Sequence, residues 1–172
     1  VAVYSTFLTR AIDQVNLDVG LHGQPVVFAL DRAGITGDDG PSHHGVLDMV
    51  LLSKVPGMTI FAPSSYQELQ QMLHDALESG DGPVALRWPK TACPQAAEDE
   101  VGSGREGRKV RTGTDVCLVG VGKMLAACTE AADVPRFGVR GVVWEGTPTV
   151  VAGTGDTGED GVELAVPADR AA

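Results

Sequence analysis

The segment Val26-Val-Phe-Ala-Leu30, followed directly by Asp31-Arg-Ala-Gly-Ile35, decides the fold class of this chain. An unbroken apolar run of this length favours a strand that is buried on both faces, as strands in parallel sheets are. The polar residues that follow mark the carboxyl end of that strand. Ligands of parallel α/β sheets bind beyond such ends, so we expect a functional site near Asp31.

Strand and helix patterns alternate along the chain up to about Lys90. Strands are expected at Val1–Val3, Val26–Leu30, Met58–Ala62 and Val84–Trp88, and helices over about 8–19, 46–53 and 66–79. No hairpin signals separate them. The alternation predicts an α/β fold in which a parallel sheet carries helices on both faces.

Hydroxyl side chains stand where two of these helices begin. Ser5 and Thr6 are expected to cap the first helix by accepting backbone N–H bonds. Ser64 or Ser65 is expected to cap the last, and Glu68 has the spacing of a capping box with Ser65. The apolar faces at helical spacing are Leu8, Ala11, Ile12, Val15 and Val19 in the first helix and Leu69, Met72, Leu73, Ala76 and Leu77 in the last.

Composition excludes several classes of protein. The chain has 172 residues, 43% of them hydrophobic and 21% charged, as soluble globular proteins with a core have. Its net charge of −10 disfavours nucleic acid as a partner, and no apolar run approaches the roughly 20 residues that span a membrane. The three cysteines lack metal-ligand spacing, and neither they nor the start of the chain indicate secretion, so we expect a cytoplasmic protein.

Polar residues with chemical potential follow three of the expected strands. They are Tyr4, Ser5, Phe7 and Arg10 after the first, Asp31, Arg32, Asp38, Asp39, His43 and His44 after the second, and Lys90 after the last. Position alone leaves open whether the cationic side chains of Arg10, Arg32 and Lys90 form an anion site or pair with acidic residues on the surface. Asp39 and His43 suit hydroxyl binding or proton transfer near neutral pH, whereas a loop histidine is often only solvated. The spacing in this loop is not that of an established metal site, so no metal is predicted.

Several segments together resemble one family. They are Tyr4-Ser-Thr-Phe-Leu8 with Arg10-Ala and Asp13-Gln-Val15, then Asp31-Arg-Ala-Gly-Ile35 with Gly37, Asp39-Gly40 and His43, and finally Asp81-Gly-Pro83 and Arg87-Trp-Pro-Lys90. Their order and gaps are similar to those of the middle, pyrimidine-binding domain of 1-deoxy-D-xylulose-5-phosphate synthases, which belong to the transketolase superfamily.

The resemblance implies an enzyme that condenses pyruvate with glyceraldehyde 3-phosphate and releases carbon dioxide. The product serves the synthesis of isoprenoids, thiamine and pyridoxal. The cofactor implied is thiamine diphosphate, with only its pyrimidine end in this segment, and Mg²⁺ is implied with ligands in an N-terminal domain. A homodimer is implied for the full-length enzyme.

Roles for individual residues also follow from the resemblance. Phe7 matches the aromatic residue that stacks on the aminopyrimidine ring, a task for a flat apolar partner. Tyr4, Arg10 and Arg32 match residues around the substrate, and Arg32 helps to hold its phosphate. Asp39 and His43 match the pair that contacts the intermediate or the acceptor hydroxyls. Lys90 stands where the family usually has a phosphate-binding Arg, which keeps the charge and loses bidentate geometry.

The expected domains follow the same resemblance. Residues 1–90 form a partial pyrimidine-binding domain, 91–113 a linker, and 114–133 the start, or stub, of a second α/β domain, the family's C-terminal domain. Residues 134–172 are atypical, as a shifted reading frame in GC-rich DNA or a disordered tail would be. The family's catalytic Glu is expected upstream of Val1, so the chain alone is expected to be inactive.

Two other interpretations remain open at this stage. Asp31-Arg-Ala-Gly34 occurs broadly in the superfamily, so a transketolase or a 2-oxoacid dehydrogenase β subunit is an alternative. The other is a non-catalytic α/β module that only binds or dimerises. Tyr4-Ser-Thr-Phe7 and the Asp39–His43 loop favour the synthase.

Overall fold

The computed structural model describes residues 1–102, 107–112, 118–131, 139–144, 147–154 and 161–165. The chain forms two compact units, Val1–Gly107 and Arg108–Ala172. Within the described residues, none of the helices combines the length and the hydrophobicity that a membrane crossing needs.

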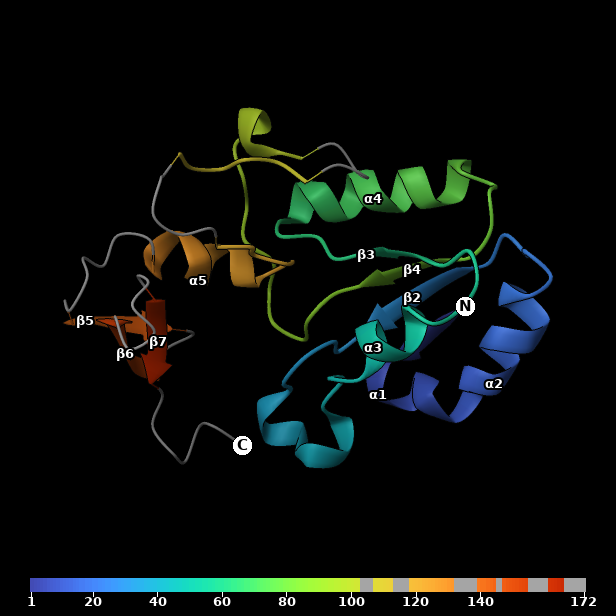
Figure 1. The fold of residues 1–172 in the computed structure, drawn as a ribbon, viewed down its shortest axis with the longest axis horizontal. Helices are drawn as coiled ribbons and strands as arrows, with labels where there is room; N and C mark the ends of the chain where they lie inside the picture. Colours follow the sequence, from blue (N-terminus) through green and yellow to red (C-terminus); the bar gives the residue numbers. More distant parts are fainter. Residues whose placement is uncertain (103–106, 113–117, 132–138, 145–146, 155–160, 166–172) are drawn as a thin grey trace. The chain divides into compact units, whose positions relative to one another are not determined.

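The first unit is built on a four-stranded parallel sheet (Figure 1). Its strands are β1 (Ala2–Tyr4), β2 (Val27–Asp31), β3 (Thr59–Phe61) and β4 (Val84–Arg87), in the order β1-β2-β4-β3. In the strand register, Tyr4 of β1 pairs with Asp31 of β2, and Leu30 of β2 pairs with Arg87 of β4. Because all strands run the same way, the carboxyl ends of β1, β2 and β4 meet at one edge of the sheet.

Helical segments connect these strands. They are α1 (Ser5–Leu8), the 3₁₀ turn η1 (Thr9–Ala11), α2 (Ile12–Gln14), the π-helical η2 (Val15–Gly20), α3 (Asp48–Leu52) and α4 (Tyr66–Glu78), with 3₁₀ turns η3 (Gly37–Asp39), η4 (Pro41–His43) and η5 (Glu98–Glu100). The first helix was expected to be continuous. Its 3₁₀ turn begins at Thr9, whose hydroxyl donates to the carbonyl of Thr6 at 2.8 Å and so competes with the α-helical bonding.

The helices cover both faces of the sheet, with α4 on one side and α1, α2 and α3 on the other (Figure 1). One core cluster contains Leu8, Val15, Phe28, Leu30, Leu52, Val55 and Ala85, and the other contains Phe61, Ala76, Val84 and Leu86. Neighbours along β4 thus enter opposite clusters, as the alternation of a strand requires. The predicted α/β fold, with a parallel sheet and helices on both faces, is confirmed.

The expected helix ends are correct only in part. Ser65 caps α4 by accepting from the backbone N–H of Glu68 at 3.1 Å, while the Glu68 carboxylate accepts from Ser64 N at 2.8 Å. The caps expected from Ser5 and Thr6 are wrong, because neither hydroxyl bonds to the helix start. The apolar face predicted for α4 is too wide, since Leu73 and Leu77 are 42% and 66% exposed.

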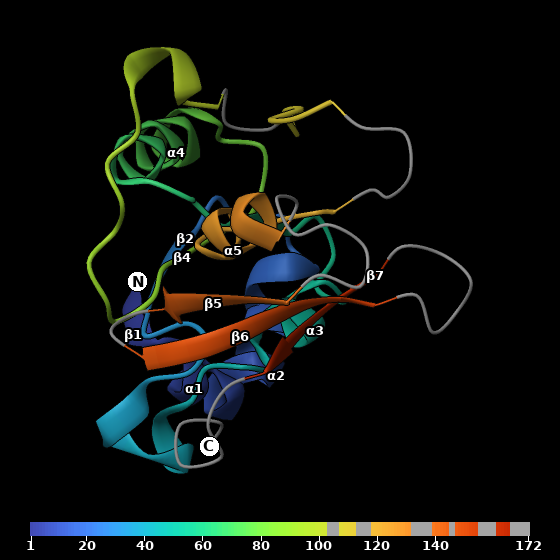
Figure 2. The ribbon, with the colours of Figure 1, turned by 90° about the vertical axis from the view of Figure 1, so that its left-hand side faces the viewer.

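The second unit contains α5 (Met124–Ala131) and a three-stranded antiparallel sheet (Figure 2). The strands are β5 (Val139–Trp144), β6 (Thr147–Thr154) and β7 (Gly161–Ala165), in that order. The strand-like pattern of Val116–Val119 falls partly outside the described residues, and Leu118 and Val119 are not in a strand. Of the region expected to be atypical, residues 134–138, 145–146, 155–160 and 166–172 lie outside the description.

Candidate active site

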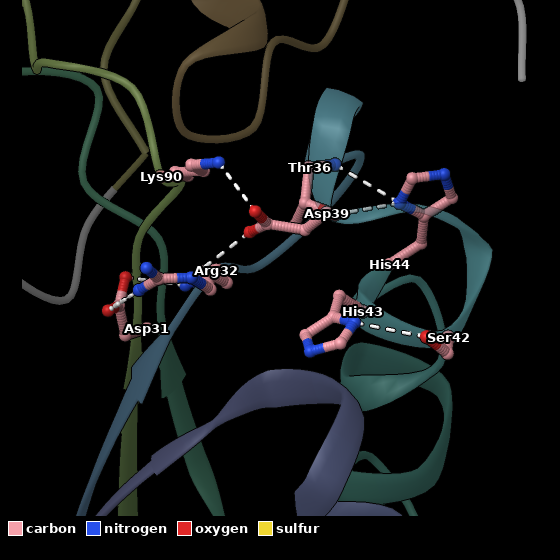
Figure 3. A network of polar contacts seen from close by, with 8 residues as sticks. All are labelled: Asp31, Arg32, Thr36, Asp39, Ser42, His43, His44 and Lys90. Carbon is pink, nitrogen blue, oxygen red and sulfur yellow. Dashed lines mark hydrogen bonds and ion pairs between the residues drawn. The ribbon is translucent and has the colours of Figure 1, made fainter.

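The carboxyl edge of the parallel sheet brings several of the sequence-predicted residues together, among them Arg32, Asp39 and Lys90 (Figure 3). Beyond the strand ends, Trp88 N donates to Leu30 O at 3.1 Å, and Ala33 N donates to Trp88 O at 2.9 Å. These bonds hold the exit of β2 beside the exit of β4. Arg32 and Lys90 therefore lie at the same edge, although 58 positions separate them in the sequence.

Arg32 turns its side chain along this edge from an unusual backbone conformation. Its φ of 59° lies in the left-handed region, which non-glycine residues rarely adopt and which is found at functional sites. Its backbone N–H donates to Asp31 at 2.7 Å, and its guanidinium bonds both Asp31 and Asp39. The guanidinium carbon also lies 4.1 Å from the centre of the Tyr4 ring, within cation–π range.

Asp39 lies between two cations. Lys90 Nζ donates to its Oδ1 at 2.7 Å, and Arg32 Nε donates to its Oδ2 at 3.3 Å. The hydrogen bond from Lys90 is the main cause that lowers the pKa of Asp39, with Arg32 adding to it and burial opposing it. Burial alone would lower the pKa of Arg32, but Asp31, Tyr4 and Asp39 together raise it. The site therefore holds a carboxylate and two cations near neutral pH.

An aromatic cluster adjoins these charges. The rings of Tyr4 and Phe7 are stacked with centroids 5.8 Å apart, and the His43 ring meets Phe7 edge-on at 5.4 Å. The exposed Arg10 places its guanidinium 5.5 Å from the centre of the Phe7 ring. Phe7 is half-buried and offers a flat apolar surface that suits stacking with a heteroaromatic ring.

The loop that carries Asp39 and His43 is held by hydrogen bonds that the sequence did not predict. Ser5 Oγ donates to Gly45 O at 3.3 Å, and Thr6 Oγ1 donates to Ser42 O at 3.2 Å. These are the two hydroxyls that were expected to cap the helix. Gly45 also exchanges two backbone hydrogen bonds with Gly34, at 2.8 and 2.9 Å.

A buried ion pair lies next to the carboxyl edge of the sheet, at the end of β4. Arg87, at the end of β4, donates to Asp48 through Nε at 2.8 Å and Nη2 at 3.3 Å. The Asp48 side chain is 1% exposed, and that of Arg87 is 16% exposed. The pair joins α3 to β4, and nothing in the local sequence predicts it because the partners are far apart along the chain.

The described residues offer two cations, Arg32 and Lys90, that are both paired with the Asp39 carboxylate, and an aromatic surface beside them. None of the described His, Cys, Asp and Glu side chains gather in a group of three that could hold a metal ion. Side chains of these kinds can bind a phosphate or carboxylate, form hydrogen bonds to hydroxyls and, in the case of His43, transfer a proton.

Comparison with known proteins identifies the family. Residues 1–95 match the family described as transketolase, pyrimidine binding domain. This segment is more than half of the chain, and the chain belongs to that family.

The particular relatives are synthases. The chain is 49% identical over 138 residues to 1-deoxy-D-xylulose-5-phosphate synthase of Thermobifida fusca, a match that covers 77% of this chain and 22% of the relative. It is 47% identical over 148 residues to the protein of that name from Heliobacterium modesticaldum, covering 83% of this chain and 23% of the relative. The chain thus spans about a fifth of the length of the curated relatives it matches.

Solved structures agree with the fold. A structure titled "Split gene transketolase, inactive beta4 tetramer" matches 76% of this chain and 42% of its own, with a TM-score of 0.66 at 26% identity. A transketolase from Pichia stipitis matches 55% of this chain and 14% of its own with a TM-score of 0.51. At 23% identity, the latter likeness shows the fold alone.

Proposed function

We propose that this chain supplies the pyrimidine-binding domain of a 1-deoxy-D-xylulose-5-phosphate synthase. The reaction is the condensation of pyruvate with glyceraldehyde 3-phosphate, with loss of carbon dioxide. The observation that carries the proposal is the position of Asp39 between Arg32 and Lys90, beside the aromatic cluster of Tyr4, Phe7 and His43. The complete enzyme is proposed to be a cytoplasmic homodimer.

Arg32 and Lys90 bind the phosphate of the acceptor in this proposal. Both already contact the carboxylate of Asp39, so an anion fits between them. Phosphate takes over the bonds that Asp39 accepts in the structure. Arg32 presents a planar fork and Lys90 a compact point charge, so Arg32 fixes the orientation and Lys90 mainly adds attraction.

Asp39 and His43 act on hydroxyl groups. Once a phosphate binds Arg32 and Lys90, the Asp39 carboxylate is free to accept a hydrogen bond from a hydroxyl group of glyceraldehyde 3-phosphate. His43 is oriented by Phe7 at its edge and by Ser42 Oγ, which lies 3.0 Å from its Nδ1. An imidazole so placed can donate a proton to a hydroxyl or accept one from it.

Phe7 would hold the pyrimidine ring of thiamine diphosphate, with Tyr4 and Arg10 beside it. The cofactor supplies the carbanion chemistry that adds to pyruvate. The exposed Arg10 covers the Phe7 ring and can move aside for a stacking partner. Mg²⁺ and the diphosphate are proposed to bind outside residues 1–95.

A chimeric enzyme tests the proposal. Residues 1–95 of this chain replace the matching segment of the Thermobifida fusca synthase. The chimera is expected to form 1-deoxyxylulose 5-phosphate from pyruvate and glyceraldehyde 3-phosphate. His43→Ala should reduce kcat by about a hundredfold or more, with unchanged circular dichroism, whereas the exposed His74→Ala should leave kcat unchanged.

The same chimera separates the alternatives. A folded chimera that binds thiamine diphosphate but transfers ketol groups from a sugar phosphate, without using pyruvate, would favour a transketolase. A folded, cofactor-binding chimera that performs neither reaction would contradict the proposal and favour a binding module.

A further inference from the structure

The imidazole of His44 closes the loop that carries Asp39 and His43 (Figure 3). Thr36 stands at the start of this loop, where it is 5% exposed, and His44 stands at its end. Thr36 N lies 3.2 Å and Thr36 Oγ1 lies 2.9 Å from Nδ1 of His44. Both contacts thus converge on one ring nitrogen.

These contacts assign the proton on the ring. The backbone N–H of Thr36 can only donate, so Nδ1 must accept and carry no proton. The proton of the neutral ring therefore sits on Nε2, which is buried and meets no hydrogen-bond partner among the described residues. A doubly protonated ring would direct an N–H at the Thr36 N–H and break the closure. The contact from Thr36 N–H thus fits a His44 ring whose Nδ1 carries no proton.

The closed segment needs such a tie. Between Thr36 and His44 the chain makes two 3₁₀ turns, and Gly37 and Gly40 take positive φ values of 61° and 80°. Glycine is conformationally permissive, so the turns alone do not fix one path. The Gly34–Gly45 backbone pair holds the base of the loop, and Thr6 Oγ1 holds its second turn through Ser42 O, but neither bond joins Thr36 to the far end of the loop as His44 does.

We propose that His44 is a positioning residue. Its ring, with Nδ1 as the acceptor, closes loop 36–44 so that Asp39 reaches Lys90 and Arg32 and His43 lies against Phe7. Its role in catalysis rests on the proposed function, whereas the closure itself is a property of this chain.

Three substitutions of His44 in the whole chain test the proposal. His44→Asn places an amide oxygen close to where Nδ1 stands, so it can still accept from Thr36 N–H. His44→Gln places its acceptor one bond further out, and His44→Ala has none. The exposed His74 on α4 provides the matched control, His74→Ala.

The readout is the pKa of the Asp39 carboxyl group, followed by carbon-13 NMR. Wild type, His44→Asn and His74→Ala should keep this pKa below its ordinary value of about 3.9, whereas His44→Gln and His44→Ala should return it toward that value. General loss of stability would not produce this split between Asn and Gln. A folded Ala or Gln variant with the wild-type pKa of Asp39 would overturn the proposal.

A second measurement applies even if the variants fail to fold. Nitrogen-15 spectra of the wild-type ring should show the proton of His44 on Nε2, and a proton on Nδ1 would overturn the proposal. Neither readout requires catalysis. An inactive chimera with an intact closure would refute the proposed function and leave this inference standing.

Discussion

Replacing Gly45 by Ala should both destabilise the first unit and displace the site. A Cβ at this position would lie 2.5 Å from Ser5 Cβ and 2.6 Å from the carbonyl oxygen of Arg32, and closer still to Ser5 Oγ. Ser5 Oγ can rotate away, but the Arg32 carbonyl belongs to the backbone. The Gly34–Gly45 hydrogen bonds must therefore stretch, or Arg32 must move.

The expected cost is that of overpacking, about 1–3 kcal/mol, with the upper half more apt because backbone must shift. For a unit of this size, a loss of about 2 kcal/mol corresponds to a fall in Tm of roughly 8–16 °C. The displaced Arg32 should also weaken its contact with Asp39, so that the pKa of Asp39 rises toward its ordinary value.

Thermal and urea unfolding, followed by circular dichroism, measure the stability change, and carbon-13 NMR measures the pKa. The control is Gly107→Ala, where an added Cβ meets nothing within 4 Å and should change stability by less than about 0.5 kcal/mol. If Gly45→Ala unfolds at the wild-type temperature and urea concentration, the close approach of Gly45 to Ser5 and Arg32 is refuted.

Three further predictions concern ion pairs and a helix cap. The lowered pKa of Asp39 means that its contacts stabilise the fold above about pH 4, the ordinary value, and that this contribution is lost as the pH falls through the folded pKa. Urea unfolding should therefore show a difference between wild type and Asp39→Asn at pH 7 that shrinks at pH 3, and equal differences would contradict the ion pair with Lys90. Asp48→Ala should lower the free energy of unfolding by about 3–5 kcal/mol because it leaves Arg87 buried without this partner. Replacing both residues by Leu should recover most of that loss. Strictly additive effects of the two substitutions in a double-mutant cycle would argue against the ion pair. Ser65→Ala should cost about 1 kcal/mol by removing the α4 cap, and an unchanged urea midpoint would show that the cap is dispensable.

The parallel sheet was predictable because local signals agree with the tertiary structure there. The apolar run beginning at Val26 became β2, shifted by one residue, and the breaks at Pro63 and Pro89 follow β3 and β4 closely. The caps expected from Ser5 and Thr6 failed because loop carbonyls compete for those hydroxyls. Local spacing cannot reveal such a competitor 36 or 40 positions away.

The grouping of the candidate residues at one edge of the sheet was predictable, but the bonds between them were not. Parallel topology alone places Arg32 and Lys90 at one edge. The sequence does not show that both bond to Asp39, because the Lys90–Asp39 contact joins positions 51 apart. It also gives no sign that Arg32 adopts a left-handed conformation, since glycine is the residue expected there. The sequence also gives no sign that His44 bonds to Thr36, because no recognised motif links the two residues.

The β strands of the second unit were not predicted. Residues after Asp133 show little periodicity, and glycine recurs through the region. Yet β5 and β6 form an antiparallel pair, in which Val139 lies opposite Ala152 and Trp144 opposite Thr147, and β6 also pairs with β7. Antiparallel pairing between neighbouring segments requires only short connections, so it can form where the amphipathic signal is weak.

The acceptor-phosphate site is the central claim, and one kinetic comparison tests it directly. In the chimeric synthase, kcat/KM is measured with glyceraldehyde 3-phosphate and with glyceraldehyde, before and after Lys90→Ala. Lys90→Ala should lower kcat/KM about tenfold or more for the phosphorylated acceptor, as loss of a hydrogen bond to a charged group does, and leave glyceraldehyde nearly unaffected. An equal loss with both acceptors, or no loss with either, would contradict the assignment of Lys90 and Arg32 to the phosphate.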